Sequence, residues 1–305
     1  MKKIILHITR FLLALAFIYS AYSKLFPAEP FELYVFSLGF LNWLNTTIAV
    51  RLLIALELFI GLSLIINIYT KQILKLTLGL LIGFTIYLIY ITIFNSVIED
   101  CGCFGDKLKL TPIESIIKNI ILLFTSVFLY LKNKTFNLIY NKLIISISLI
   151  ISIALPFILS PPDGFIDTEL KNILTKNTID SEIIGDFTQN NKQLSFKRRK
   201  AIVCFFSTTC PFCKKAAQKL SIITKSNNIK TPIFYIFFGS KKALPQFWKD
   251  SKSIKFPYKF IDTKTFFTYS GSSLPSIMFI DNERIINHIG YRGLDDKVVI
   301  NFIKN

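Results

Sequence analysis

The sequence is poor in histidine and in acidic residues. Only two histidines, His7 and His288, occur among 305 residues, and they lie far apart. A structural zinc site needs four ligands, usually two cysteine pairs or one pair with two histidines, so we predict no metal site. Only 19 Asp and Glu stand against 36 Lys and Arg, a net charge of +17. This surplus suits anionic lipid or an acidic partner, or follows from a Lys-rich composition alone. No nucleic-acid-reading motif is present, so we expect no nucleic-acid partner.

Hydrophobic residues make up 52% of the chain, with 30 Phe, which indicates a portion embedded in the lipid bilayer. A helix needs about 20 mostly apolar residues to cross a bilayer. Five segments meet this requirement: Ile4–Leu25, Leu52–Tyr69, Leu76–Val97, Ile113–Leu131 and Leu143–Leu159. A cleaved signal peptide is the alternative for the first segment, but the four later spans favour a retained helix. The aromatic stretch 31–44 is too short to span and is expected to lie at the interface or to dip part-way into the bilayer. The SPPDG run at 160–164 marks a domain boundary.

Loop charges indicate the orientation of these spans. The N-terminus and the second and fourth connections carry Lys and no acid. The first and third connections contain Glu29, Glu32, Glu99, Asp100 and Asp106. Because positively charged loops stay in the cytoplasm, we expect a multi-pass protein of the cytoplasmic (inner) membrane with a cytoplasmic N-terminus. Five spans then place residues 165–305 in the periplasm or its equivalent, where disulfides form.

A C-P-F-C motif at residues 210–213 follows an apolar run at 202–206. A buried strand, a turn and a helix that opens on C-x-x-C are typical of the redox site of a thioredoxin-like domain. At a helix N-terminus, unpaired amides and the helix dipole stabilise the thiolate of Cys210. Cys213 lies one turn further in, close enough for a disulfide and more shielded from solvent. A zinc half-site or a structural disulfide is the alternative.

A second cysteine pair, Cys101 and Cys103, lies in the third connection. The expected topology puts this pair on the same side of the membrane as the C-P-F-C motif. Two cysteines one residue apart can close only a strained ring, and strained disulfides tend to be labile and oxidising. Metal binding is the alternative, but no further ligands accompany the pair. We therefore expect the two pairs to exchange electrons.

The N-terminal half resembles the DoxX/MauE family of four-helix membrane proteins. The matching pieces are RFLLALAFIYSAYSKLFPAEPFE at 10–32, ALELFIGLSLI at 55–65 and CGCFG at 101–105, and the resemblance covers about residues 4–132. It implies a helical bundle with a part in forming disulfides in exported proteins. The bundle is similar to vitamin K epoxide reductase homologues, some of which carry a fifth helix and a trailing thioredoxin-like domain. Those enzymes use a second loop pair and a C-x-x-C in the membrane, which are absent here. We predict no cofactor and leave a quinone open.

Glu57 lies inside a predicted span, where a carboxylate is costly and is usually functional or paired. We consider two roles for it, proton handling and a structural hydrogen bond. Glu57 is expected either to stay protonated or to meet Arg10 or Arg51 inside the bundle.

The C-terminal half resembles the thioredoxin fold, closest to the TlpA-like membrane-anchored branch. Its strands are expected at 201–206, 232–238, 258–261, 276–281 and 284–290, and its helices at 211–225, 242–250 and 295–304. Leu274 and Pro275 match the family's cis-proline, which implies that they hold the substrate backbone. Thr209 replaces a common Trp, and Cys204 occupies a position that often holds a buried, proton-transferring Asp. On a core strand, Cys204 is expected to be a buried hydrophobe, and a third redox role is the alternative.

The sequence thus predicts a multi-domain protein. An α-helical four-helix transmembrane bundle occupies residues 1–135, a fifth helix and linker 136–164, and an α/β thioredoxin-like domain 165–305. The expected function is that of a membrane-anchored thiol–disulfide oxidoreductase of the cell envelope that acts on exported cysteine-containing proteins. Its Cys210–Cys213 pair exchanges electrons with Cys101 and Cys103. The alternatives are a non-catalytic membrane assembly factor and an envelope thiol reductase that serves cytochrome c maturation.

Overall fold

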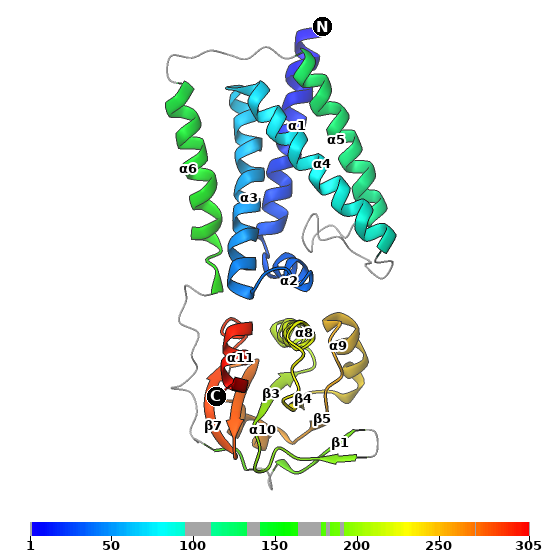
Figure 1. The fold of residues 1–305 in the computed structure, drawn as a ribbon, viewed down its shortest axis with the longest axis vertical. Helices are drawn as coiled ribbons and strands as arrows, with labels where there is room; N and C mark the ends of the chain where they lie inside the picture. The colour runs from blue at the N-terminus through cyan, green and yellow to red at the C-terminus, as the bar shows by residue number, and fades with distance from the viewer. Residues whose placement is uncertain are drawn as a thin grey trace. The chain divides into compact units, whose positions relative to one another are not determined.

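The computed structural model describes residues 2–94, 111–132, 141–163, 178–180, 184–189, 192–271 and 273–304. Contacts divide the chain into two compact units, which Figure 1 shows as ribbons. The first unit comprises Met1–Val35 and Thr47–Pro161, and the second comprises Phe36–Thr46 and Pro162–Asn305. Residues 36–46 therefore belong to the second unit, although they lie among the predicted membrane segments.

The first unit is helical. Its helices are α1 (Lys2–Leu25), α2 (Glu29–Ser37), α3 (Trp43–Ile66), α4 (Thr70–Phe94), α5 (Pro112–Lys132) and α6 (Asn141–Leu159). The last residues of α2 and the first residues of α3 belong to the second unit. Within the described ranges, five of these helices are long and apolar enough to cross a membrane, all except the nine-residue α2. The prediction of five apolar helices is confirmed.

Helices α1 and α3 approach each other closely at Gly61. A Cβ atom at this position would lie 2.6 Å from Cγ1 of Ile18 and 3.0 Å from the carbonyl oxygen of Ala14. Because real Cβ atoms do not come this close to other atoms, glycine permits the contact between the two helices. Apolar side chains from four helices of this unit form a shared core: Leu13, Phe17, Ile60, Leu64, Leu74, Leu81 and Leu129.

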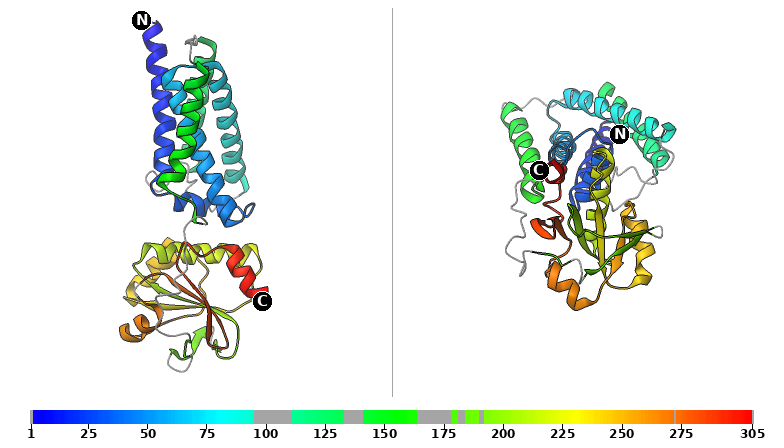
Figure 2. Two further views of the ribbon diagram at one scale, coloured as in Figure 1. Left: turned by 90° about the vertical axis from the view of Figure 1, so that its left-hand side faces the viewer. Right: turned by 60° about the horizontal axis from the view of Figure 1, so that its bottom comes forward.

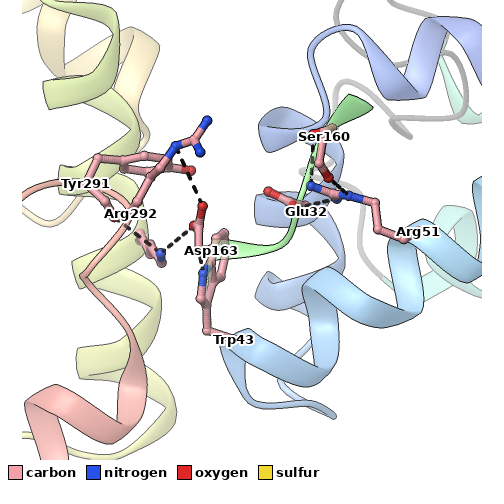
Figure 3. Close-up of polar contacts among 8 residues, drawn as sticks. Glu32, Trp43, Arg51, Ser160, Asp163, Tyr291 and Arg292 are labelled. Carbon is pink, nitrogen blue, oxygen red and sulfur yellow. Dashed lines mark hydrogen bonds and ion pairs between the residues drawn. The ribbon is translucent and has the colours of Figure 1, made fainter. Parts of the chain in front are cut away.

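Helix α3 begins at Trp43, whereas the hydrophobic pattern predicts that this span starts at Leu52. Its first turns are polar, but their polar groups have partners. The N–H of Asn45 donates to Oδ1 of Asn42 at 2.8 Å, and Oγ1 of Thr46 donates to the carbonyl of Asn42 at 2.9 Å. One turn later, Arg51 pairs with Glu32 (Figure 3). These hydrogen bonds and this ion pair allow the polar residues before Leu52 to form the first turns of helix α3.

The second unit is built on a five-stranded sheet in the order β5-β4-β3-β6-β7. The strands are β3 (Ala201–Ser207), β4 (Ile233–Phe238), β5 (Tyr258–Phe260), β6 (Ser276–Asp281) and β7 (Arg284–Ile289). β3, β4 and β5 run parallel, whereas β6 pairs antiparallel with both β3 and β7. This mixed sheet has the thioredoxin-like topology that the sequence predicts.

Helices and a hairpin cover the two faces of this sheet, as Figures 1 and 2 show. One face carries α8 (Pro211–Ser226), α9 (Leu244–Ser251) and α11 (Asp296–Lys304), with the short 3₁₀ helix η2 (Lys241–Ala243) leading into α9. The other carries α10 (Thr263–Ser270) and the hairpin of β1 (Phe187–Gln189) and β2 (Lys192–Leu194). With both faces covered, the central strand β3 is buried almost throughout, which explains its unbroken apolar run.

Helix α10 is not predicted from the sequence pattern. Its sequence, TKTFFTYS, is rich in β-branched and aromatic residues that favour strands. The helix is nevertheless capped, because a side-chain oxygen of Asp262 accepts a hydrogen bond from the N–H of Thr265 at 3.0 Å. It also buries Phe266 against the sheet, with its ring centroid 5.4 Å from that of Phe205. The capping residue is the local signal that could have identified this helix.

Candidate active site

The C-P-F-C motif lies at the start of α8, directly after the central strand β3. Cys210 is the N-cap of α8 and has an extended backbone conformation. Pro211 takes the first helical position, where a missing N–H costs no hydrogen bond. The backbone N–H of Cys213 donates to Sγ of Cys210 at 3.2 Å. The strand-to-helix junction thus aims backbone donors at the first sulfur atom.

The two thiols of the motif differ in exposure and in acidity. Hydrogen bonding by the Cys213 thiol lowers the pKa of Cys210 to about 7, with help from the amides of Cys213 and Phe212 and the charge of Lys214. Burial, together with the hydrogen bond to Cys210, raises the pKa of the Cys213 thiol far above its ordinary value. Because the thiolate is the nucleophile, Cys210 is suited to attack and Cys213 to a later step.

The strand register places the predicted substrate-binding residues at the same end of the sheet. β6 runs antiparallel to β3, with Ser276 opposite Phe205. Pro275, the residue before β6, therefore lies near the end of β3 that leads to Cys210. The peptide bond between Leu274 and Pro275 is cis, as expected from the family resemblance.

A buried hydrogen bond next to Pro275 does not follow from the sequence. The Oγ atom of Ser276 lies 2.8 Å from Nε2 of His288 on β7, and both side chains are buried. The two residues are 12 positions apart, and His288 is isolated in the sequence. Only the pairing of β6 with β7 brings them together.

Cys204 lies on β3 and is fully buried. Its strand neighbours are Tyr235 on β4 and Ile277 on β6. Burial raises the pKa of the Cys204 thiol well above its ordinary value, which keeps it protonated and unreactive. The expectation of a buried, hydrophobe-like cysteine agrees with this environment. The three cysteines in the described ranges, Cys204, Cys210 and Cys213, are all free thiols.

Phe212, which precedes Cys213 in the motif, lies at the rim of the site. It is 45% exposed. Its ring centroid lies 5.8 Å from that of Tyr291 and 5.3 Å from Nζ of Lys215. Lys214, which directly follows the motif, forms an ion pair with Asp250 at 2.7 Å. The rim therefore combines an exposed aromatic ring with positive charge.

A buried lysine of helix α8, Lys219, contacts Tyr291, the residue that packs against Phe212. Lys219 is fully buried, its Nζ lies 3.4 Å from the centroid of the Trp43 ring system, and it donates to the carbonyl oxygen of Tyr291 at 3.5 Å. Oδ2 of Asp163 lies 3.6 Å from this Nζ and accepts a hydrogen bond from Nε1 of Trp43 at 3.1 Å. Figure 3 shows Asp163 between Trp43, Tyr291 and Arg292. The cation is thus paired and lies against aromatic rings, as a buried charge requires.

Glu57 in the first unit has a partner that differs from the two arginines expected from the sequence. Both of its carboxylate oxygens accept hydrogen bonds from Nζ of Lys24, at 2.7 and 2.8 Å. Lys24 also donates to Oγ of Ser20 at 2.7 Å, and the ion pair is buried. The expected partners are engaged elsewhere: Arg51 pairs with Glu32, and Nη2 of Arg10 lies 3.3 Å from Nδ1 of His7. The expectation that Glu57 meets Arg10 or Arg51 is wrong, because Lys24 comes from the neighbouring helix at the same depth.

The second cysteine pair, Cys101 and Cys103, lies outside the described residues. Within the described ranges, no group of three or more His, Cys, Asp or Glu side chains is placed to hold a metal ion.

Comparison with known proteins bears on both units. Residues 2–132 match the family described as methylamine utilisation protein MauE. A curated relative, protein TlpB of Flavobacterium psychrophilum, is 28% identical, and the match covers 94% of this chain and 91% of that protein. The similarity to TlpB thus extends over both units.

Solved structures resemble the C-terminal part of the chain. The thioredoxin domain of a thiol–disulfide oxidoreductase from Bacteroides vulgatus is 16% identical, covering 39% of this chain and 91% of its own, with a TM-score of 0.33. StoA from Bacillus subtilis is 16% identical, covering 37% and 89%, with a TM-score of 0.32. A thiol:disulfide interchange protein from Chlorobium tepidum is 12% identical, covering 46% and 96%, with a TM-score of 0.34. The sheet order and the place of the C-P-F-C motif carry the fold assignment. The chain thus joins a membrane domain whose residues 2–132 match the MauE family model to a thioredoxin-like domain that carries the C-P-F-C motif.

Proposed function

We propose that the protein exchanges disulfides with exported cysteine-containing proteins through Cys210 as the attacking thiol and Cys213 as the resolving thiol. The observation that carries this assignment is the asymmetry of the pair. The pKa of Cys210 is lowered to about 7, whereas burial raises that of Cys213. A cysteine pair with a purely structural role would not need one activated thiol beside one protected thiol, which disfavours a non-catalytic assembly factor.

The reaction runs in two exchanges. The Cys210 thiolate attacks one sulfur of a partner disulfide, forms a mixed disulfide and releases the partner's other sulfur as a thiolate, which takes up a proton. Cys213 then loses its proton and attacks the Cys210 sulfur, so that the partner leaves as a dithiol and the pair becomes a disulfide. The reverse sequence oxidises a partner dithiol. The reduction potentials of the Cys210–Cys213 pair and of the partner decide the direction. In an envelope thiol reductase, the same reaction proceeds in the direction that reduces the partner disulfide.

The orientation and the electron partner of the pair are also part of this proposal. The loop charges support a cytoplasmic N-terminus, an inner-membrane location and a second unit outside the cytoplasm. Under that topology Cys101 and Cys103 share a side of the membrane with the C-P-F-C motif, and we assign them the role of exchanging electrons with it. Leu274 and Pro275 are assigned to the substrate backbone, because they lie at the same end of the sheet as Cys210. No step of the reaction requires a quinone.

Trapping of mixed disulfides tests this proposal. Cys213→Ala removes the resolving thiol, so the attacked partner stays attached to Cys210. Cells that express this variant should contain mixed disulfides with envelope proteins, visible after non-reducing purification and mass spectrometry. Cys204→Ala serves as the matched control, since it removes a buried thiol that lies outside the C-P-F-C motif. Equal recovery of partners from Cys210→Ala would contradict the assigned roles, and the absence of partners from Cys213→Ala would contradict the exchange itself.

A further inference from the structure

The loop after β7 places a cation beside the exposed ring of the redox motif. Tyr291 lies in this loop, and its ring contacts Phe212. Arg292 follows it in the chain and has a side chain that is 48% exposed. Phe212 is exposed between the two cysteines of the motif, so a polypeptide that brings a sulfur atom to Cys210 can lie on this ring and bring its neighbouring residues near the loop.

The position of Tyr291 is fixed by burial and by a hydrogen bond. Its side chain is buried, and its carbonyl oxygen accepts a hydrogen bond from the buried Lys219. Lys219 itself is held by the ring of Trp43 and by the carboxylate of Asp163. Because the loop is anchored at Tyr291, the backbone from which Arg292 projects has a defined position.

Arg292 is held at one nitrogen atom only. Its Nε lies 3.9 Å from Oδ1 of Asp163, a weak ion pair, and Asp163 is shared with Trp43 and Lys219 (Figure 3). In the part of the chain that the structure describes, Nη1 and Nη2 of Arg292 have no hydrogen-bond or ion-pair partner. The guanidinium group therefore presents its terminal N–H donors to solvent, in the geometry that binds a carboxylate with two hydrogen bonds.

We propose that Arg292 is a specificity-determining residue that recognises a carboxylate close to the reacting cysteine of the partner protein. This inference rests on the proposed exchange reaction and adds the substrate class, namely cysteine segments flanked by Asp or Glu. An extended segment advances about 3.3 Å per residue, so a carboxylate within a few residues of the reacting cysteine can lie beside Arg292 while the segment lies on Phe212. Lys214, which follows the motif, forms a close ion pair with Asp250 at 2.7 Å, whereas the ion pair of Arg292 with Asp163 is longer, at 3.9 Å. Arg292 is therefore the better recognition group.

Two matched peptides test the inference with the full-length protein in detergent. Each contains one disulfide, and they differ only in an Asp or an Asn three residues from one cysteine. The rate constant for their reduction by the reduced protein is measured by alkylation and mass spectrometry. The Asp peptide should react about fivefold faster at low salt, the size expected for a partly exposed ion pair. The difference should largely disappear at high salt, because ions screen exposed charges.

Variants separate Arg292 from the general positive charge of the domain. Arg292→Gln should bring the ratio of the two rates to about one, whereas Arg292→Lys should keep part of it through its charge. Arg284→Gln removes a cation from an exposed position on β7 and should leave the ratio unchanged. Equal rates for the two peptides with the unmodified protein, or an unchanged ratio in Arg292→Gln, would overturn the inference, as would loss of the ratio in Arg284→Gln. If neither peptide is reduced, the exchange reaction itself is overturned, and this inference with it.

Discussion

At the scale of single residues, the difference between Cys210 and Cys213 follows from a few local contacts. Cys210 is the N-cap of a helix and receives hydrogen bonds, and Lys214 adds positive charge nearby. Cys213 sits one turn inside, where burial disfavours its thiolate. One turn of helix is therefore enough to give two identical side chains different chemistry.

The pKa of Cys210 predicts the pH dependence of its reactivity. With a pKa of about 7, the thiolate fraction rises from about a tenth at pH 6 to about nine-tenths at pH 8. Alkylation of the reduced protein should therefore accelerate about tenfold over this range and then level off, as followed by mass spectrometry of the peptide that contains Cys210. Lys214→Gln removes a nearby positive charge, which should move the midpoint to higher pH. A rate that keeps rising steeply above pH 8 would contradict the lowered pKa.

At the scale of elements, the ion pair of Lys24 and Glu57 joins helices α1 and α3 inside the membrane unit. Both side chains are buried, and Ser20 supplies a further hydrogen bond to the lysine. Close to the pair, the small residue Gly61 lets the same two helices approach each other. A buried ion pair in an apolar bundle specifies which helices meet, since the wrong neighbour would leave a charge without a partner.

Removal of one partner of this ion pair should be much worse than removal of both. Glu57→Gln or Lys24→Gln leaves a buried charge unpaired and should lower the free energy of unfolding by about 3–5 kcal/mol. The double variant removes both charges and should recover a large part of this loss. The measurement is thermal unfolding in detergent, followed by circular dichroism at a helix-sensitive wavelength. If Glu57→Gln is as stable as the unmodified protein but slower in disulfide exchange, Glu57 handles protons and is not a structural residue.

At the scale of the whole molecule, the number of spans decides which compartments the two ends of the chain occupy. The described helices provide five segments that can cross a membrane. An odd number of crossings puts the N-terminus and the C-terminal domain on opposite sides. The proposed exchange between the two cysteine pairs depends on this arrangement, because thiols on opposite sides of a membrane cannot react.

Reporter fusions test the expected orientation. A periplasmic reporter fused after Lys134, in the fourth connection, should be inactive, whereas the same reporter after Asn305 should be active. The positive loops predict this result, because Lys and Arg near the ends of spans stay in the cytoplasm. A cytoplasmic reporter at the same two positions provides the control and should give the opposite signals. Equal signals from both positions would contradict five crossings and remove the basis for electron exchange with Cys101 and Cys103.

The sequence by itself determined the features that depend on neighbouring residues. The apolar lengths predict the membrane helices, because a span needs only consecutive hydrophobic residues. The C-P-F-C motif after a buried strand predicts the redox site, because a helix N-terminus lowers a thiol pKa through its own backbone. Even the missed helix α10 has a local signal in the cap Asp262.

The tertiary structure alone decided which distant residues meet. Glu57 finds Lys24, 33 positions away, and His288 finds Ser276 across a strand pair. Trp43 and Asp163, 120 positions apart, both contact Lys219 and so become part of the unit that carries the redox site. The physical reason is that one buried cation can be neutralised by any carboxylate that the fold brings near it. The local sequence pattern predicts that Lys219 lies on a helix. Only the packing of the chain shows that it is buried and which groups surround it.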